Sequence, residues 1–238
     1  MDKKKIITIV LIVLGLFLVL FLVFSTRKKT DTSSLSPEQN TANNQTAELV
    51  LSESEKPVIS LTPRSDGHEL KLKISNIPSN ITQIDYELIY SATDNGLTME
   101  KGVGDTLKIT TGSIEKDLLL GTASCTNGCK YKYDEGVDSG TLSLYLYTDD
   151  NQSTVFETPF ILITSSDIKK DGGFELTTQD FSVSATTTTN DYFTVIKNYP
   201  AYYSVFSSGT GKGKVTSITP DTITKDDMTS LVGDYQTQ

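Results

Sequence analysis

The sequence predicts an all-β protein in which an antiparallel β-sandwich, followed by a smaller β-rich unit, is carried by an N-terminal transmembrane helix and a flexible stalk. Three observations predict this class: one charge-free apolar run near the N-terminus, a polar segment after it, and many short segments in which apolar and polar residues alternate. No long segment repeats apolar residues every three to four positions, as amphipathic helices do. The predicted boundaries are a tail at 1–5, a transmembrane helix at 6–24, a stalk at 25–56, a sandwich at 57–165 and a smaller β-rich domain with a polar C-terminal tail at 166–238.

The predicted anchor, residues 6–24, carries no charge and consists mostly of Ile, Leu, Val and Phe. As a helix this run measures roughly 28 Å, close to the ~30 Å hydrocarbon core of a bilayer. A cleaved signal peptide is the alternative, but its cleavage site requires small residues. Here the bulky residues Leu22, Val23 and Phe24 end the run, and Arg27 follows shortly. We therefore expect an uncleaved anchor that holds the protein in a lipid bilayer.

Basic residues flank this run on both sides, at 3–5 and at 27–29. The positive-inside rule alone therefore does not orient the helix. The rest of the chain suits an oxidising compartment, as its cysteines indicate below. We expect a single-pass protein of the cell membrane with a cytoplasmic N-terminus and an extracytoplasmic C-terminal domain.

The charge is unevenly distributed along the chain. Residues 1–30 carry six basic residues and one acidic residue, so the net charge of −9 leaves −14 on residues 31–238. Binding to nucleic acid requires a basic surface that contacts phosphates. The composition of the exported part therefore excludes nucleic acid as an expected partner.

The stalk and the first strands follow the anchor. Residues 30–56 are rich in Ser, Thr, Asn, Gln and Glu, which is typical of a flexible segment. Residues 68–75 alternate cleanly, with Leu70, Leu72 and Ile74 on one face, and predict a half-buried strand. The other strands expected in the sandwich lie at 57–61, 84–90, 107–110, 114–120, 141–148 and 155–164, with a turn at 94–96 ending the strand before it.

Residues 141–148 form the clearest predicted strand. Leu142, Leu144 and Leu146 face one way, whereas Tyr145 and Tyr147 face the other. About seven short strands with turns between them are typical of an antiparallel sandwich.

Residues 165–173 interrupt this pattern and predict a domain boundary or a long connection. The second unit then has its own β-like segments, at 174–178, 181–187, 192–197, 202–207 and 214–219. Near the C-terminus, Thr224 as an N-cap and Gly233 as a stop signal predict a helical turn.

The strands ITQIDYELIYS and GTLSLYLYTDD, together with the anchor and the stalk, resemble those of bacterial membrane-anchored envelope proteins with immunoglobulin- or fibronectin-type sandwiches. The resemblance implies an immunoglobulin-like β-sandwich at 57–165. The Cys…Trp…Cys pattern of true immunoglobulin domains is missing, because the chain has no Trp and its two Cys lie close together.

Cys125 and Cys129 flank an Asn-Gly turn that can bring their sulfur atoms together. In an oxidising compartment they should form a disulfide that stabilises the fold by about 2 kcal/mol. Free or redox-active thiols are one alternative. A zinc site is another, but it would need further ligands, and His68 is the one histidine of the chain. We expect a structural disulfide, no metal and no cofactor.

No catalytic motif stands out in the sequence. His68 has no G-x-S-x-G nucleophile to act on and is expected in a turn or on the surface. A pair of carboxylates, as glycoside hydrolases use, stays open as an alternative. Acidic turns at 94–96, 134–138 and 149–151 could together supply calcium ligands, although solvated turns are the favoured interpretation.

The densest aromatic cluster lies near the C-terminal part of the chain. Tyr199, Tyr202, Tyr203 and Phe206 form a candidate binding surface, since Tyr gives contact area at a small entropic cost. Packing between neighbouring strands is the favoured alternative.

The architecture predicts a non-enzymatic surface module that binds or adheres to other proteins or to an envelope polymer. The alternatives are an envelope enzyme of the carboxylate hydrolase class and a tethered accessory subunit of a secretion or pilus-like machine.

Overall fold

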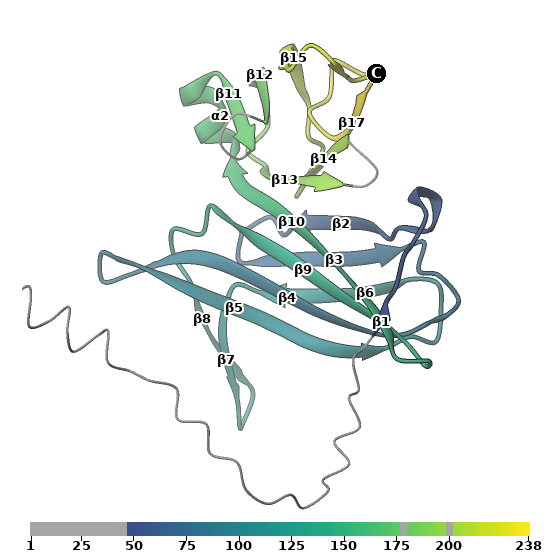
Figure 1. Ribbon diagram of the computed structural model, residues 1–238. Helices are drawn as coiled ribbons and strands as arrows, with labels where there is room; N and C mark the ends of the chain where they lie inside the picture. Colours follow the sequence, from purple (N-terminus) through teal and green to yellow (C-terminus); the bar gives the residue numbers. More distant parts are fainter. Residues whose placement is uncertain (1–46, 177–179, 199–201) are drawn as a thin grey trace, which may run out of the picture. The chain divides into compact units, whose positions relative to one another are not determined.

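The computed structural model describes residues 47–176, 180–198 and 202–238. They form a predominantly β structure of antiparallel sheets with one short α-helix, which confirms the prediction of a β-rich, antiparallel fold (Figure 1). The predicted anchor at 6–24 and the stalk up to residue 46 lie outside the described residues. Within the described ranges no helix has both the length and the apolar character needed to cross a membrane.

The largest sheet has nine strands, and all of its pairings but one are antiparallel. The exception is the short strand β1, which pairs parallel with β10. In spatial order the strands are β16 (Ile223–Thr224), β17 (Gly233–Thr237), β14 (Tyr202–Ser207), β13 (Tyr192–Asn198), β10 (Gln152–Thr164), β9 (Ser139–Thr148), β4 (Ile81–Asp94) and β5 (Leu97–Lys108), with β1 (Ala47–Glu48) beside β10.

Three smaller sheets complete the β structure. The first is β2 (Val58–Pro63), β3 (Glu69–Ser75) and β6 (Ile114–Leu119); the second is β11 (Gly173–Leu176), β12 (Phe181–Thr187) and β15 (Gly213–Thr219); the third is the hairpin of β7 (Gly121–Cys125) and β8 (Cys129–Tyr133).

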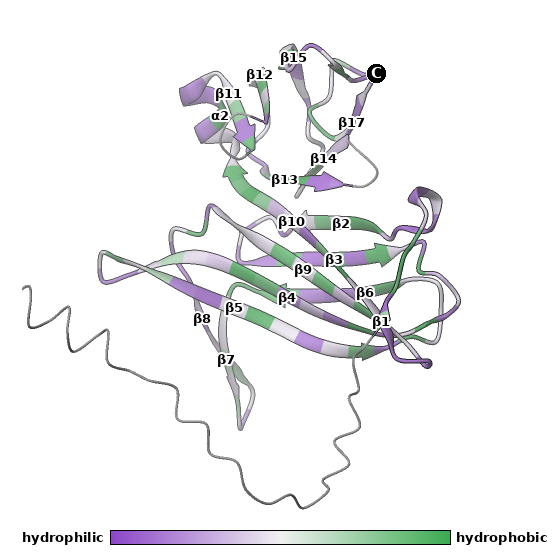
Figure 2. Ribbon diagram, viewed as in Figure 1, coloured by the Kyte–Doolittle hydropathy of each residue, from purple (hydrophilic) through white to green (hydrophobic). Residues whose placement is uncertain are grey.

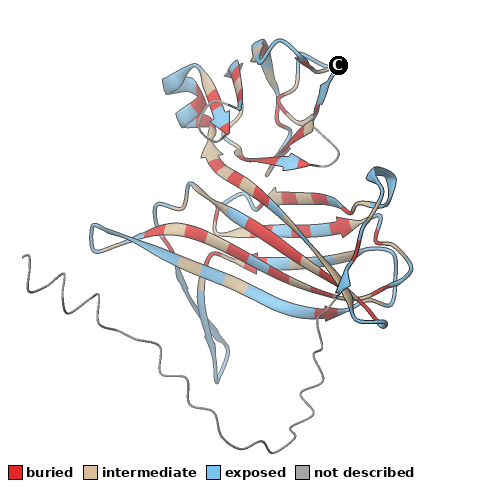
Figure 3. Ribbon diagram, viewed as in Figure 1, coloured by how far each residue is buried: buried red, intermediate tan, exposed pale blue. Residues whose placement is uncertain are grey.

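Two hydrophobic clusters stabilise the described residues. The first joins β3, with Leu72 and Ile74, to the β4 and β9 region of the main sheet, with Leu88 and Leu144. Buried and less buried residues alternate along most of β4 and along the second half of β9, so one face of each strand packs on this cluster (Figures 2 and 3). The second cluster contains residues of β11 to β17 and includes the fully buried Tyr235.

Strand β10 is shared by both clusters. It pairs with β9 through Ser153 to Ile161 and with β13 through Phe160 to Thr164, so the main sheet runs without a break from one cluster to the other. The main sheet therefore continues across the boundary proposed at residue 165. That residues 166–238 fold separately stays a prediction.

Side chains of β13 continue the hydrogen bonding of strand β2. The Asn198 amide donates from Nδ2 to the carbonyl of Ile59 at 2.8 Å and accepts from the Ile59 N–H through Oδ1 at 3.3 Å. The Thr194 hydroxyl donates to the carbonyl of Leu61. These bonds satisfy polar backbone groups that would otherwise be buried without partners.

Three local expectations differ from the structure. The connection predicted at 165–173 contains helix α2 (Ser165–Asp171), because Thr164 and Asp167 form a capping box and Gly172 ends the helix in the left-handed conformation, with φ of 76°. The helical turn predicted after Thr224 is instead strand β16 followed by a turn. The end of the predicted stalk is ordered as β1 and a 3-10 turn (Glu53–Glu55), since Leu49 buries its side chain in the first cluster.

Candidate functional site

A pair of tyrosines projects from the outer face of the main sheet. On β9, Leu144 and Leu146 are fully buried, whereas the alternating Tyr145 and Tyr147 are half-buried on the opposite face. The register places Tyr145 between Asp85 of β4 and Val155 of β10. The period-two pattern of β9 thus turns two aromatic rings towards solvent.

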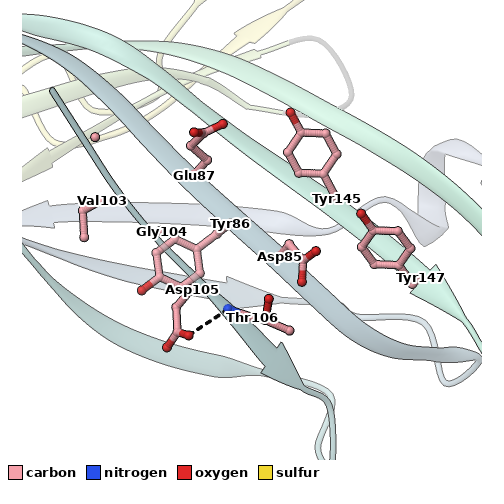
Figure 4. A pocket seen from close by; sticks show the side chains of 10 residues that line it. Asp85, Tyr86, Glu87, Val103, Gly104, Asp105, Thr106, Tyr145 and Tyr147 are labelled. Atoms are coloured by element: carbon pink, nitrogen blue, oxygen red, sulfur yellow. Dashed lines mark hydrogen bonds between the residues drawn. The ribbon is translucent and has the colours of Figure 1, made fainter. Parts of the chain in front are cut away.

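A groove runs beside these tyrosines, over β4 and β5 (Figure 4). Its volume is about 670 Å³. Gly102 and Gly104 of β5 lie opposite Ile89 and Glu87 of β4, on the outer face. Because these glycines have no side chains, the sheet is hollow at this point. A Cβ atom at Gly104 would lie 2.6 Å from the carbonyl oxygen of Tyr86, so a glycine is required there.

Carboxylates line the same groove. Asp85 accepts a hydrogen bond from Gln83 Nε2 at 3.0 Å. Asp105 lies opposite Tyr86 and so projects from the other face of the sheet; it accepts from the backbone N–H of Thr106 at 2.8 Å, and its Oδ2 lies 3.6 Å from Nζ of Lys116 (Figure 4). Glu87 is exposed on the same face as Asp85. The groove therefore offers several hydrogen-bond acceptors to a ligand.

The phenol of Tyr147, beside the groove, is held in its neutral form. Burial, followed by the charge of Asp85, raises the pKa of Tyr147 above its ordinary value. The Tyr147 hydroxyl therefore keeps its proton at neutral pH and can donate hydrogen bonds. Burial, followed by the charge of Asp105, also raises the pKa of Tyr86, but Tyr86 is 6% exposed and belongs to the first cluster, on the buried face of β4.

A second hollow lies on the other side of the tyrosine pair, with a volume of about 410 Å³. Glu48 of β1 and Ser153 and Val155 of β10 line it together with the two tyrosines. Val155 is 48% exposed. Tyr145 and Tyr147 thus form a ridge between two hollows, which we call the tyrosine ridge.

Cys125 and Cys129 lie at disulfide-bonding distance at the end of the β7–β8 hairpin, with their Cα atoms 4.1 Å apart. The hairpin, which we call the arm, pairs with no other strand of the described chain, and nearly all of its residues are exposed (Figure 3). Isolated two-stranded hairpins are marginally stable in water. The disulfide supplies the constraint that burial does not provide.

The base of the arm is fixed by a buried carboxylate. Asp134, 8% exposed, accepts a hydrogen bond from the Tyr90 hydroxyl at 2.8 Å and pairs with the ammonium group of Lys101. Burial, and then the hydrogen bond to Asp134, raise the pKa of Tyr90. The arm is thus held at its base by Asp134 and at its tip by the disulfide.

His68 stacks on the arm. Its ring lies 4.2 Å from that of Tyr133 at an angle of 6°, and Tyr133 is nearly parallel to Tyr131 at 6.1 Å. The histidine is therefore in a surface stack beside the turn that precedes β3, as the sequence predicted.

The acidic turns do not come together at one end of the main sheet. Residues 94–96 join β4 to β5, whereas residues 149–151 join β9 to β10 at the other end of β4, where Ile81 pairs with Thr148. Asp134 is already bound by Lys101 and Tyr90. Within the described ranges no group of three or more His, Cys, Asp or Glu side chains could hold a metal ion.

The residues of the predicted aromatic surface that can be located lie on both faces of β14. Tyr203 is 6% exposed and stacks on Phe181 in the second cluster, with ring centroids 4.3 Å apart. Phe206 packs against the first cluster, and Tyr202 is half-buried. Tyr199 lies outside the described residues. For Tyr203 and Phe206, the burial supports the packing interpretation.

The sequence alone did not reveal the groove. Its signals are the outward pair Tyr145 and Tyr147 and the Gly-Val-Gly segment at residues 102–104, which are far apart in the sequence and meet only through the register of β9, β4 and β5. Comparisons with protein families, with curated proteins and with solved structures give no match to this chain.

Proposed function

We propose that this protein is a single-pass, membrane-anchored module outside the cytoplasm, with an immunoglobulin-like sandwich that binds an envelope polysaccharide without chemical conversion. The ligand is a hydroxyl-rich, uncharged glycan chain that crosses the tyrosine ridge. The observation that carries the proposal is the ridge itself, with open hollows on both sides and acceptor groups beside it.

The chemistry of the groove supports this ligand class. Tyrosine rings give rigid apolar contact area while their hydroxyl groups donate hydrogen bonds. Carboxylates such as Asp85 and Glu87 accept charge-assisted hydrogen bonds from hydroxyl groups. A glycan presents apolar ring faces and many hydroxyl groups, so both kinds of contact are matched. The net charge of −14 beyond residue 30 disfavours polyanionic polymers.

Other features support the location. The charge-free run at 6–24 is long enough to span a bilayer as a helix. The Cys125–Cys129 pair, at bonding distance on an exposed hairpin, fits an oxidising compartment. These features support the proposed orientation, in which the polar C-terminal region lies outside the cytoplasm.

The ligand is tested by titrating soluble neutral and anionic polysaccharides into the purified full chain in detergent. Neutral polymer should bind, and the double variant Y145A/Y147A should weaken binding at least about tenfold, which corresponds to about 1.4 kcal/mol. Gly102→Phe should also weaken it, because a Cβ at Gly102 meets nothing closer than 3.6 Å and the ring would fill the groove. Tyr131→Ala, on the arm, is the matched control and should bind normally.

Two results would contradict the proposed binding. One is equal affinity of the ridge variants and the parent chain. The other is preferential binding of the anionic polymer with a strong salt dependence. Release of reducing ends from the bound polymer would favour the hydrolase alternative, with Asp85 and Glu87 as its candidate carboxylates.

The orientation is tested by adding protease to intact cells from outside. The C-terminal region should be degraded while a membrane-bound N-terminal fragment remains. A protected C-terminal region, or a full-length chain recovered in the aqueous fraction, would contradict the membrane assignment.

A further inference from the structure

Strand β5 has an open backbone edge. It is the last strand of the main sheet, pairs with β4 over its full length of 12 residues, and has no described strand on its other side. Natural proteins protect such edges with prolines, bulges, short strands or charged side chains. The charged residues of β5 have both signs, so a partner strand with complementary charges can offset them. Strand β5 contains no proline, and its pairing with β4 shows no register shift. Its unpaired N–H and C=O groups are available for another strand.

The sequence of β5 is complementary to itself in one antiparallel register. When two copies pair with Val103 opposite Val103, Lys101 of each lies opposite Asp105 of the other, and Met99 lies opposite Leu107. Opposed residues of an antiparallel pair lie on the same face of a sheet, so each pair can touch. The register thus makes two ion pairs and two apolar pairs by symmetry.

Neighbouring registers lose this match. A register centred on Gly102 places Lys101 opposite Val103 and Met99 opposite Asp105. A register centred on Gly104 places Asp105 opposite Val103 and Lys101 opposite Leu107. Both set a charge against an apolar side chain. In a register shifted by one residue, residues of the outer face of one copy would lie beside residues of the inner face of the other copy.

The charges already present around β5 extend the same pattern. Lys101 is paired with Asp134, and Asp105 lies 3.6 Å from Lys116. Across the new contact the charges would follow the order Asp134, Lys101, then Asp105 and Lys116 of the second copy, alternating in sign. Alternation favours the pairing, because no like charges are neighbours.

We propose that β5 binds β5 of a second copy of this chain, in the antiparallel register centred on Val103, and so forms a twofold dimer with one continuous sheet. The contact is isologous, so it closes on itself and does not propagate. This inference goes beyond the glycan binding proposed above and does not depend on it.

Single cysteine variants of the full chain in native membranes test the register. Opposed residues of an antiparallel pair have Cα atoms about 4.5–5.5 Å apart, which suits a disulfide. Val103→Cys should therefore form a covalent dimer under mild oxidation, seen on a non-reducing gel. Leu97→Cys is the control: its side chain is 69% exposed, against a half-buried Val103, but it has no opposed cysteine in this register. Random collisions between chains would cross-link the more exposed Leu97→Cys to a greater extent than Val103→Cys.

A mixed experiment provides a second measurement if Val103→Cys folds poorly. Met99→Cys and Leu107→Cys chains carrying different tags, expressed together, should link to each other, and neither should link to itself. Cross-linking of Leu97→Cys to the same extent as Val103→Cys would overturn the proposal. So would the absence of both the Val103→Cys dimer and the mixed dimer.

Discussion

The arm and the β4–β9 pair are both antiparallel ladders, yet their order has different origins. In β4 and β9 one face is buried, with Leu88, Leu142 and Leu144 all at 0% exposure. In the arm both faces meet solvent, and the ladder is held by a disulfide at one end and by Asp134 at the other. Burial stabilises the first ladder throughout its length, whereas the second depends on its two ends.

This difference shows that an exposed segment can be ordered in two ways. An exposed segment loses conformational entropy on folding and gains little from burial, so its order requires specific constraints. The arm and the tyrosine ridge solve this differently. The ridge stands on the buried face of β9, while the arm is fixed by covalent and polar contacts.

The largest expected effect is in the buried ladder. Leu144→Ala removes a fully buried side chain from the centre of the first cluster and should lower the free energy of unfolding by about 3 kcal/mol. Tyr131→Ala, on the arm, should change it by less than about 0.5 kcal/mol. Chemical denaturation measures both, and equal losses would mean that the arm is packed as the core is.

The next effect concerns the base of the arm. Asp134→Ala leaves the buried Tyr90 hydroxyl and the Lys101 ammonium group without their carboxylate, which should cost about 2 kcal/mol. Amide hydrogen exchange should also speed up in β7 and β8 before it does in β4. Asp134→Asn, which retains an acceptor oxygen, should lose less. Unchanged exchange in β7 and β8 would show that Asp134 does not fix the arm.

The disulfide should act on the arm more than on the whole chain. The double variant C125S/C129S should accelerate amide exchange in β7 and β8, while the free energy of unfolding falls by no more than about 2 kcal/mol, the chain-entropy value for such a short loop. Exchange in β9 should not change. If β9 loses its protection as well, the arm and the core unfold as one unit.

The smallest expected effect is a pH dependence of stability that comes from Asp66, near the base of the arm. The Arg64 side chain lowers the pKa of Asp66 to about 2, against an ordinary value of 3.8. Because the pKa of Asp66 is lower in the folded chain than in the unfolded chain, its ionised carboxylate stabilises the fold at pH values above about 4. This stabilisation is lost as the pH falls from about 4 through 2. Asp66→Asn should therefore flatten the pH dependence of the melting temperature in that range. An unchanged slope would show that the pair contributes nothing.

The strands that the sequence predicted are those with one buried face. β3, β9 and β12 alternate because each packs one side on a hydrophobic cluster. Most of β5 and the whole arm were missed, since nearly all of their residues are exposed and charged or small residues interrupt the apolar positions. The capping box of α2 was present as Thr164 and Asp167, but a helix of seven residues gives no periodic signal.

The candidate site was less predictable than the fold. The outward direction of Tyr145 and Tyr147 follows from the sequence of β9 alone. Their meeting with Asp85 and the hollow at Gly104 depends on the pairing of β9, β4 and β5, which residue patterns do not specify. The aromatic residues near Tyr203 show the opposite case. They lie close together in the sequence, but Tyr203 packs inside the second hydrophobic cluster.

The short strand β1 has a mechanical consequence for a tethered protein. Its two pairing bonds run from the N–H of Ala47 to the carbonyl of Asn151, at 3.0 Å, and from the N–H of Leu49 to that of Ser153, at 2.8 Å. If the N-terminal segment is fixed in a bilayer, a pull on the bound module loads these bonds before any other. Detaching β1 would release slack at roughly 3.4 Å per residue up to Ser54, whose carbonyl accepts a hydrogen bond from Asn76 Nδ2. The first yielding step would then absorb tension, and it would also open the second hollow beside the tyrosine ridge, which Glu48 of β1 lines.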